Sequence, residues 1–145
     1  MSDFVYSFQD VSVIVGFTTI TGFADDAESI LISYDTDQTS TVVGADGDTV
    51  TSLVTSYLAT ITLRLHHKSP SNQVLSLINN AYRANTVVPT PFLIRDARGL
   101  DTHAAAHIFV TKQADYSAGA EAKTKEWVLT APTLITNLGG GTAIA

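Results

Sequence analysis

Apolar and polar residues alternate along much of this chain with a period of two, which is typical of half-buried β-strands. The clearest case is residues 59–66, where one face carries only the apolar side chains Ala59, Ile61, Leu63 and Leu65. The other face carries the polar and charged side chains Thr60, Thr62, Arg64 and His66. Because β-branched residues are also abundant, we expect a mainly β protein with this strand in its core.

Further stripes of the same kind predict other strands. The apolar residues that form these stripes are Val11, Val13 and Val15; Ile30, Ile32 and Tyr34; Ala104, Ala106, Ile108 and Val110; and Trp127 with Leu129. We expect them to form the core faces of a sheet or barrel. Residues 92–94 should join a strand that begins near Leu100, because residues 96–99 (Asp-Ala-Arg-Gly) have the composition of a turn.

One segment has helical spacing instead. Its apolar positions are Val74, Ile78, Ala81 and Tyr82. Ser69 is a suitable N-cap, and Pro70 suits the first helical position, where its missing N–H is not needed. The helix should end near Asn85, because residues 89–91 (Pro-Thr-Pro) prevent its continuation. We therefore expect one α-helix beside the strands.

A long polar stretch extends from about residue 35 to residue 55 and is rich in Asp, Thr, Ser and Gly. It is too long for a tight turn and is flanked by strand-like residues, so it predicts a projecting β-hairpin or loop. Loops of this length in a compact domain usually carry function, which makes this segment the best place to look for a partner.

Neither a repeat nor a dividing linker interrupts the remaining chain. We expect residues 1–138 to form one domain with the loop at about 35–55 projecting from it. Residues 139–145 begin with three glycines and predict a flexible C-terminal tail. A chain of 145 residues is long enough to bury a sizeable core without disulfides or metals.

Composition excludes several classes of function. Cysteine is absent, so disulfides, thiolate metal ligands and thiol nucleophiles are excluded. The net charge of −6, with only 8 Lys and Arg residues, argues against a surface that binds phosphate backbones. No apolar run approaches the ~18 residues of a membrane helix, and the first residues lack the pattern of a secretory signal. The sequence thus indicates a protein that stays in the cytoplasm and has no membrane partner.

The histidines do not predict a metal site. His66 and His67 are adjacent on the expected strand and should point to opposite sides of the sheet. His103 and His107 should share a strand face, but roughly 13 Å would separate them, too far to ligate one ion directly. We interpret all four as surface or interface residues.

Other chemical motifs are also incomplete. The pairs Asp35/Asp37 and Asp46/Asp48 lack the spaced acidic loop ending in Glu that an EF-hand requires. The C-terminal Gly-Gly-Gly-Thr has no lysine with which to hold phosphate, and no Gly-x-Ser-x-Gly turn is present. We therefore predict no metal, no cofactor and no catalytic residue, and expect a protein that is not an enzyme.

Residues 60–77 (TITLRLHHKSPSNQVLSL) resemble the strand-to-helix junction of phage tail tube proteins, most specifically at Ser-Pro-Ser-Asn, residues 69–72. Residues 43–47 (VGADG), 92–96 (FLIRD) with Gly99, and 121–127 (EAKTKEW) add to this resemblance, which covers most of the chain. It implies a tail-tube-like β-sandwich or small barrel with one flanking α-helix. It also implies hexameric rings that stack into a hollow tube inside a contractile sheath.

The resemblance further implies a virion tail component, assembled in the cytoplasm of a bacterial host. Its partners would be further copies of itself, the tail sheath protein, the tape-measure protein and the baseplate hub, while DNA passes through the lumen without specific binding. On this basis we expect the polar loop to reach the next ring, with Asp35, Asp37, Thr41, Asp46 and Asp48 as candidate stacking residues. Carboxylates facing the lumen would repel DNA phosphates, with Asp25, Asp26 and Glu28 as candidates.

Three alternatives stay open from the sequence. The nearest are a related tail component, such as a tail terminator, and a type VI-like secretion tube subunit. A β-sandwich carbohydrate-binding module would instead use aromatic side chains as a platform, with Tyr6, Phe8, Phe17, Tyr57 and Tyr116 as candidates. That alternative predicts a stable monomer with saturable sugar binding.

Overall fold

The computed structural model describes residues 8, 11–24, 28–86, 89–97, 100–121 and 123–139. Across these residues the chain is mainly β with one helix, which confirms the predicted fold class. The strands are β1 (Val11–Val15), β2 (Thr18–Ile20), β3 (Ile30–Tyr34), β4 (Thr39–Val43), β5 (Thr49–Leu53), β6 (Ala59–Leu65), β7 (Phe92–Asp96), β8 (Thr102–Ala105), β9 (Phe109–Lys112), β10 (Lys125–Ala131) and β11 (Leu134–Asn137). The helix is α1 (Ser71–Arg83).

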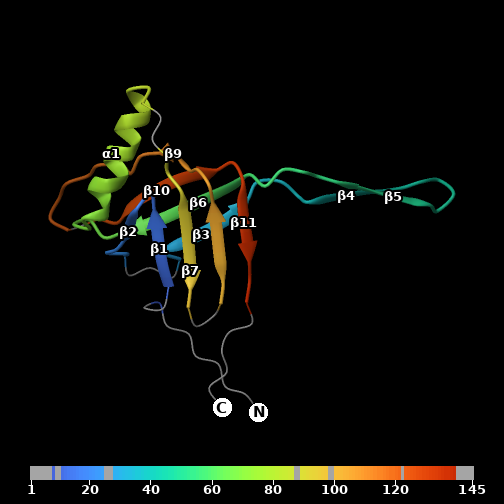
Figure 1. The fold of residues 1–145 in the computed structure, drawn as a ribbon, viewed down its shortest axis with the longest axis horizontal. Helices are drawn as coiled ribbons and strands as arrows, with labels where there is room; N and C mark the ends of the chain where they lie inside the picture. The colour runs from blue at the N-terminus through green and yellow to red at the C-terminus, as the bar shows by residue number, and fades with distance from the viewer. Residues whose placement is uncertain are drawn as a thin grey trace, which may run out of the picture.

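Two antiparallel sheets form the body of the molecule. One has five strands in the order β11-β8-β7-β1-β2, and the other has four in the order β3-β6-β10-β9. In Figure 1 the strands of the five-stranded sheet stand upright, and those of the four-stranded sheet run across behind them. Over the described residues both sheets are open, so the chain forms the sandwich rather than the small barrel.

The core lies between the two sheets, because each contributes one apolar face. From β6 the side chains of Ala59, Ile61, Leu63 and Leu65 are fully buried, as the alternating pattern predicts. The neighbouring strand β10 adds Trp127, which is paired with Leu63, and Leu129, which is paired with Ile61. The five-stranded sheet contributes Val13, Val15, Phe92, Ile94 and Leu134.

The predicted stripe through residues 104–110 is wrong, because the chain changes sheets there. Strand β8 ends at Ala105 in the five-stranded sheet, whereas β9 begins at Phe109 in the four-stranded sheet. Ala105 and Ile108 are buried, while Ala104 and Ala106 are exposed. A crossing between sheets breaks the period of two, so one continuous alternation cannot describe both strands.

The hairpin predicted after residue 92 is confirmed by the antiparallel pairing of β7 with β8. Its second strand begins at Thr102, close to the predicted start near Leu100, and Leu100 itself has a positive φ of 62°. Two of the predicted turn residues, 98 and 99, lie outside the described residues, and so do residues 140–145 of the predicted C-terminal tail. Gly139 donates its N–H to Oδ1 of Asp101 at 2.7 Å.

Helix α1 begins one residue later than predicted, with Pro70 at the N-cap and no side-chain capping hydrogen bond. It ends at Arg83, and Asn85 has a φ of 63°. Its buried residues are Ser71, Leu75 and Asn79. The predicted apolar face is therefore displaced, since Val74, Ile78, Ala81 and Tyr82 are only partly buried. Two of the three buried side chains are polar, which is why the apolar pattern pointed elsewhere.

The Ser-Pro-Ser-Asn segment joins the helix to both sheets. Ser69 Oγ donates to the Thr21 carbonyl at 2.5 Å, and Ser71 Oγ accepts from the Thr21 N–H at 2.9 Å. Asn72 Oδ1 accepts from Nε1–H of Trp127 at 2.9 Å. Gly22 has a φ of 73°, and a Cβ there would lie 2.6 Å from Ser69 Oγ. The junction thus depends on a residue without a side chain at position 22.

Candidate functional site

The segment between β3 and β6 forms a hairpin of strands β4 and β5, which make a two-stranded sheet of their own. Every residue of both strands is exposed. Figure 1 shows this hairpin extending away from the sandwich, on the side opposite α1. A two-stranded hairpin with neither face covered is marginally stable in water. The geometry therefore indicates a surface that binds something else.

Apolar side chains lie on both faces of the hairpin. Val42 and Val50 are paired across the strands, and each has an exposed fraction of 66%. Val43 and Leu53 lie on the other face, with exposed fractions of 67% and 78%. Apolar side chains this exposed, and gathered on one projection, are typical of a protein–protein contact. Around them, Thr41 and Thr51 share a hydrogen bond of 3.1 Å between their hydroxyl groups.

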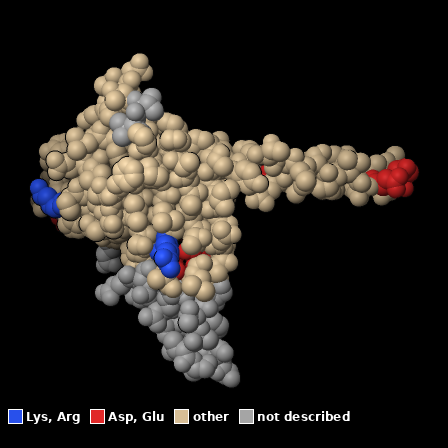
Figure 2. Space-filling model, in the orientation of Figure 1, with Lys and Arg blue, Asp and Glu red and all other residues tan. Residues whose placement is uncertain are grey.

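The tip of the hairpin is a tight turn that carries two carboxylates. Gly44 N–H donates to the Asp48 carbonyl at 2.6 Å, and Gly47 N–H donates to the Gly44 carbonyl at 3.0 Å. Gly47 has a φ of 90°, a conformation that favours glycine. Asp46 and Asp48 therefore lie together at the far end of the molecule, where acidic side chains gather in Figure 2.

The structure separates the five candidate stacking residues into three places. Asp46 and Asp48 are at the tip, and Thr41 is on β4. Asp35 and Asp37 are at the base, where Asp35 Oδ1 accepts from the Thr60 hydroxyl at 2.9 Å. This hydrogen bond holds Asp35 against β6 of the sandwich. Of the five candidate stacking residues, only Thr41, Asp46 and Asp48 therefore lie on the projecting part of the hairpin.

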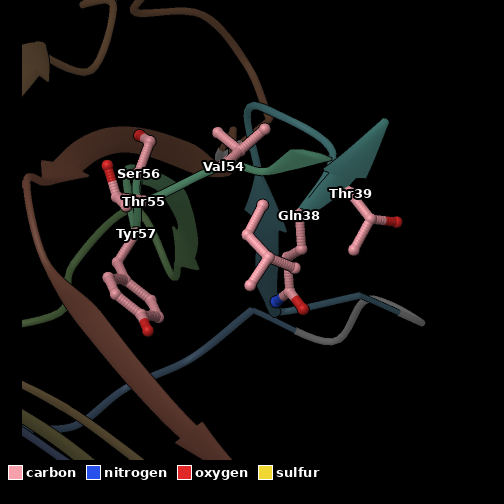
Figure 3. A pocket seen from close by; sticks show the side chains of 7 residues that line it. Gln38, Thr39, Val54, Thr55, Ser56 and Tyr57 are labelled. Atoms are coloured by element: carbon pink, nitrogen blue, oxygen red, sulfur yellow. The ribbon is translucent and has the colours of Figure 1, made fainter. Parts of the chain in front are cut away.

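A hollow of about 320 Å³ lies at the base of the hairpin. Its lining residues, shown in Figure 3, are Gln38, Thr39, Leu53, Val54, Thr55, Ser56 and Tyr57. They include neither a carboxylate nor a histidine nor a lysine, so this hollow lacks the converging titratable groups of an active site. Because its lining includes Thr39 of β4 and Leu53 of β5, the hollow is continuous with the surface of the hairpin.

Of the candidate lumen-facing acids, Asp25 and Asp26 lie outside the described residues. Glu28 is exposed just before β3, and its carbonyl accepts a hydrogen bond from Nη1 of Arg64. The same guanidinium forms a salt bridge with Glu126, with 3.1 Å between Nε and Oε2. The backbone of Glu28 therefore lies next to an arginine whose side chain is paired with the Glu126 carboxylate.

The histidines are dispersed, and part of their prediction was wrong. Strand β6 ends before His66 and His67, and His107 lies in the connection after β8, so His103 and His107 do not share a strand. His103 Nδ1 is 2.9 Å from the Thr136 hydroxyl. Burial lowers the pKa of His103 below its ordinary value, while the Asp101 carboxylate acts in the opposite direction. In the described ranges, no three His, Asp or Glu side chains gather so as to hold a metal ion.

The aromatic candidates lie in separate contacts. Phe8 packs edge-on against Phe23 at 5.3 Å between ring centroids, and the ring of Tyr116 lies 5.4 Å from Lys125 Nζ. Phe17 is 90% exposed, and Tyr57 lines the hollow at the hairpin base. Tyr6 lies outside the described residues. Where the structure describes the chain, no ring contact joins two of these candidates, which argues against one sugar-binding platform.

No helix in the described part of the chain is long and apolar enough to cross a membrane.

The family model of the bacteriophage PhiTE tail tube protein matches residues 3–139. No curated protein sequence matches the chain.

Solved structures have the same fold. The PVC sheath/tube terminator of an extracellular contractile injection system, in its extended state, has a TM-score of 0.65 at 22% identity, covering 93% of this chain and 98% of that one. The tube-terminating cap of the anti-feeding prophage has a TM-score of 0.66 at 16% identity, covering 96% and 95%. The PVC sheath–tube complex in the extended state gives 0.62 at 23% identity, covering 88% of each chain. At these identities the likeness concerns the fold alone.

Proposed function

Because this chain belongs to the bacteriophage PhiTE tail tube protein family, we propose that it forms hexameric rings that stack into the inner tube of a contractile tail. As a member of that family, the chain is a structural protein of the virion tail and not an enzyme. Our proposal concerns the assembly of the subunits and the proteins that bind them. The observation that carries it is the hairpin of β4 and β5, whose strand residues are all exposed.

The open sheet edges support ring formation. The outer strands are β11 and β2 in one sheet and β3 and β9 in the other. A strand at a sheet edge has unpaired N–H and C=O groups, which the edge strand of a neighbouring subunit can satisfy. Closing a ring through such pairs removes the free edges. In this proposed arrangement residues 1–138 act as one domain.

The hairpin is suited to contact between rings. We assign Thr41, Asp46 and Asp48 to the part that reaches the next ring, because they lie on β4 and at the tip. Asp35 and Asp37 stay at the base of this contact. Covering the valines and Leu53 against another subunit would remove apolar surface from water, which favours assembly.

The acids Asp25, Asp26 and Glu28 are proposed to face the channel, where they would repel DNA phosphates and prevent the genome from adhering. The net charge of −6 supports this role. In a cryo-EM map of the assembled tube we expect Glu28 at the wall of the channel. A channel wall whose charge is neutral or positive would contradict the proposal.

The proposed partners are the tail sheath protein outside the tube, the tape-measure protein inside it and the baseplate hub at its end. A solved structure of the same fold is a sheath–tube complex, which supports a sheath around this tube. DNA would pass through the lumen without specific binding.

A tail terminator is the second candidate, because two structures of the same fold are a sheath/tube terminator and a tube-terminating cap. A terminator caps one end of a tube, so it should form single rings that do not stack. A tube subunit should stack without limit. The exposed hairpin favours the tube, since an extended apolar projection on every subunit provides a repeating contact.

The test is negative-stain electron microscopy of the purified full chain at increasing concentration. We expect hollow tubes of uniform width. Single rings at every concentration would favour the terminator. A chain that remains monomeric at every concentration, when measured by sedimentation, would contradict self-assembly and favour a binding module.

A further inference from the structure

A second hollow lies between α1 and β9, away from the hairpin. Its volume is about 460 Å³, and it is lined by Asn79, Tyr82, Arg83, Val110, Thr111, Lys112 and Gln113. Two of these residues carry positive charge, and none carries negative charge. We call it the basic hollow.

The two walls of the basic hollow are held together by a hydrogen bond and an aromatic contact. Asn79 Nδ2 donates to Gln113 Oε1 at 3.2 Å across the hollow. The rings of Tyr82 and Phe109 pack edge-on, with 5.2 Å between their centroids. One wall is the edge strand β9, and the other is the last part of α1. The hollow is therefore formed before any ligand arrives, which limits the entropy lost on binding.

Among the described residues, neither cation of the basic hollow, Arg83 or Lys112, forms a salt bridge, in contrast to Arg64. The whole chain has only 8 Lys and Arg residues against 14 Asp and Glu residues. Two unpaired cations beside an open strand edge thus form a surface complementary to an acidic segment.

The tip of the hairpin has the matching chemistry. Asp46 and Asp48 are exposed, and no described cation forms a salt bridge with them. The hairpin extends on the side of the sandwich opposite α1 (Figure 1), so a subunit cannot fill its own hollow. A second copy can do so, through a head-to-tail contact between two different surfaces. Contacts of this kind generate closed rings or open stacks.

We infer that the hairpin tip of one subunit docks into the basic hollow of another, with Asp46 and Asp48 facing Arg83 and Lys112. This inference rests on the proposed function, because it identifies the surface that receives the hairpin within the assembly. The contact also sets the polarity of the tube, since tip and hollow lie at opposite ends of each subunit.

Charge reversal tests the pairing. We expect D46K/D48K and R83E/K112E each to raise the concentration for half-maximal assembly by about tenfold, since like charges then face each other. The variant with all four changes restores opposite charges. Its concentration for half-maximal assembly should lie within about threefold of that of the natural chain. The control E121K reverses the charge of an exposed carboxylate that belongs to neither the hairpin tip nor the lining of the basic hollow, and should assemble normally. The inference would be overturned if D46K/D48K and R83E/K112E assembled normally. It would also be overturned if the variant that combines all four substitutions assembled as poorly as either pair alone.

Cross-linking separates this inference from the proposed tube. The chain has no cysteine, so A45C/T111C introduces one thiol at the tip and one at the hollow. Oxidation by copper-phenanthroline should join subunits into a ladder of covalent oligomers, whereas the control A45C/A104C should not. A ladder without tubes in the microscope would support the docking and contradict the tube. Tubes without a ladder would contradict the docking alone, and an acidic segment of the sheath would then be the occupant to test.

Discussion

Replacing residues 39–53 with a short Gly-Ser linker should abolish tubes while leaving the sandwich folded. The hairpin contributes no residue to the buried core, so its removal creates no cavity. The Val54 N–H donates to the Gln38 carbonyl at 2.8 Å, so the ends to be joined already lie together. We expect the melting temperature to change by less than about 5 °C. Tube formation should fall below detection, because both the apolar faces and the acidic tip are gone.

Thermal unfolding and negative-stain microscopy on the same preparation measure both parts of this prediction. The control S40T/S52T changes two paired, exposed hairpin positions without removing the hairpin, and should form tubes of ordinary length. If the shortened chain made ordinary tubes, the hairpin would have no part in stacking. If it failed to fold, the hairpin would be part of the folding unit rather than a projection.

The substitution Trp127→Ala should have the largest effect on stability. Trp127 is only 2% exposed, and it pairs with Leu63 where the two sheets pack together. Its removal leaves a large cavity and also deprives Asn72 Oδ1 of the indole N–H that it accepts from. Substitutions of this kind cost about 3–5 kcal/mol. Because domains are stable by only about 5–15 kcal/mol, a large part of the total would be lost.

Urea unfolding followed by far-UV circular dichroism measures this loss. The control Trp127→Phe keeps an aromatic ring in the core and removes the hydrogen bond, so we expect a smaller loss of about 1–2 kcal/mol. The helix should be the first element affected, because Asn72 lies in its first turn. A loss below about 1 kcal/mol for Trp127→Ala would show that the sheets can close around the cavity.

The strands that face the core on one side were predictable from the residues. Along β6, β1 and β10 only alternate side chains enter the space between the sheets, so burial imposes a period of two that is visible in the sequence. The long hairpin was predictable for a local reason as well. A segment rich in Asp, Thr and Gly cannot bury enough apolar surface to pack within its own domain.

The candidate surface was predictable only in part. Asp46 and Asp48 are close in sequence, so their position at one turn follows from local structure. Arg83 and Lys112 belong to a helix and a strand in different regions of the chain. Nothing in their separate sequence contexts indicates that they line one hollow.

The class of the fold, the faces of its main strands, the helix and the polar projection follow from local patterns in the sequence. Three features become visible only in the folded chain: the crossing between sheets after Ala105, the polar residues that α1 buries, and the cations that line one hollow. The physical reason is the range of the interactions. Alternation and turn chemistry act between neighbours, whereas the contact of Asn79 with Gln113 exists only after α1 has packed on β9.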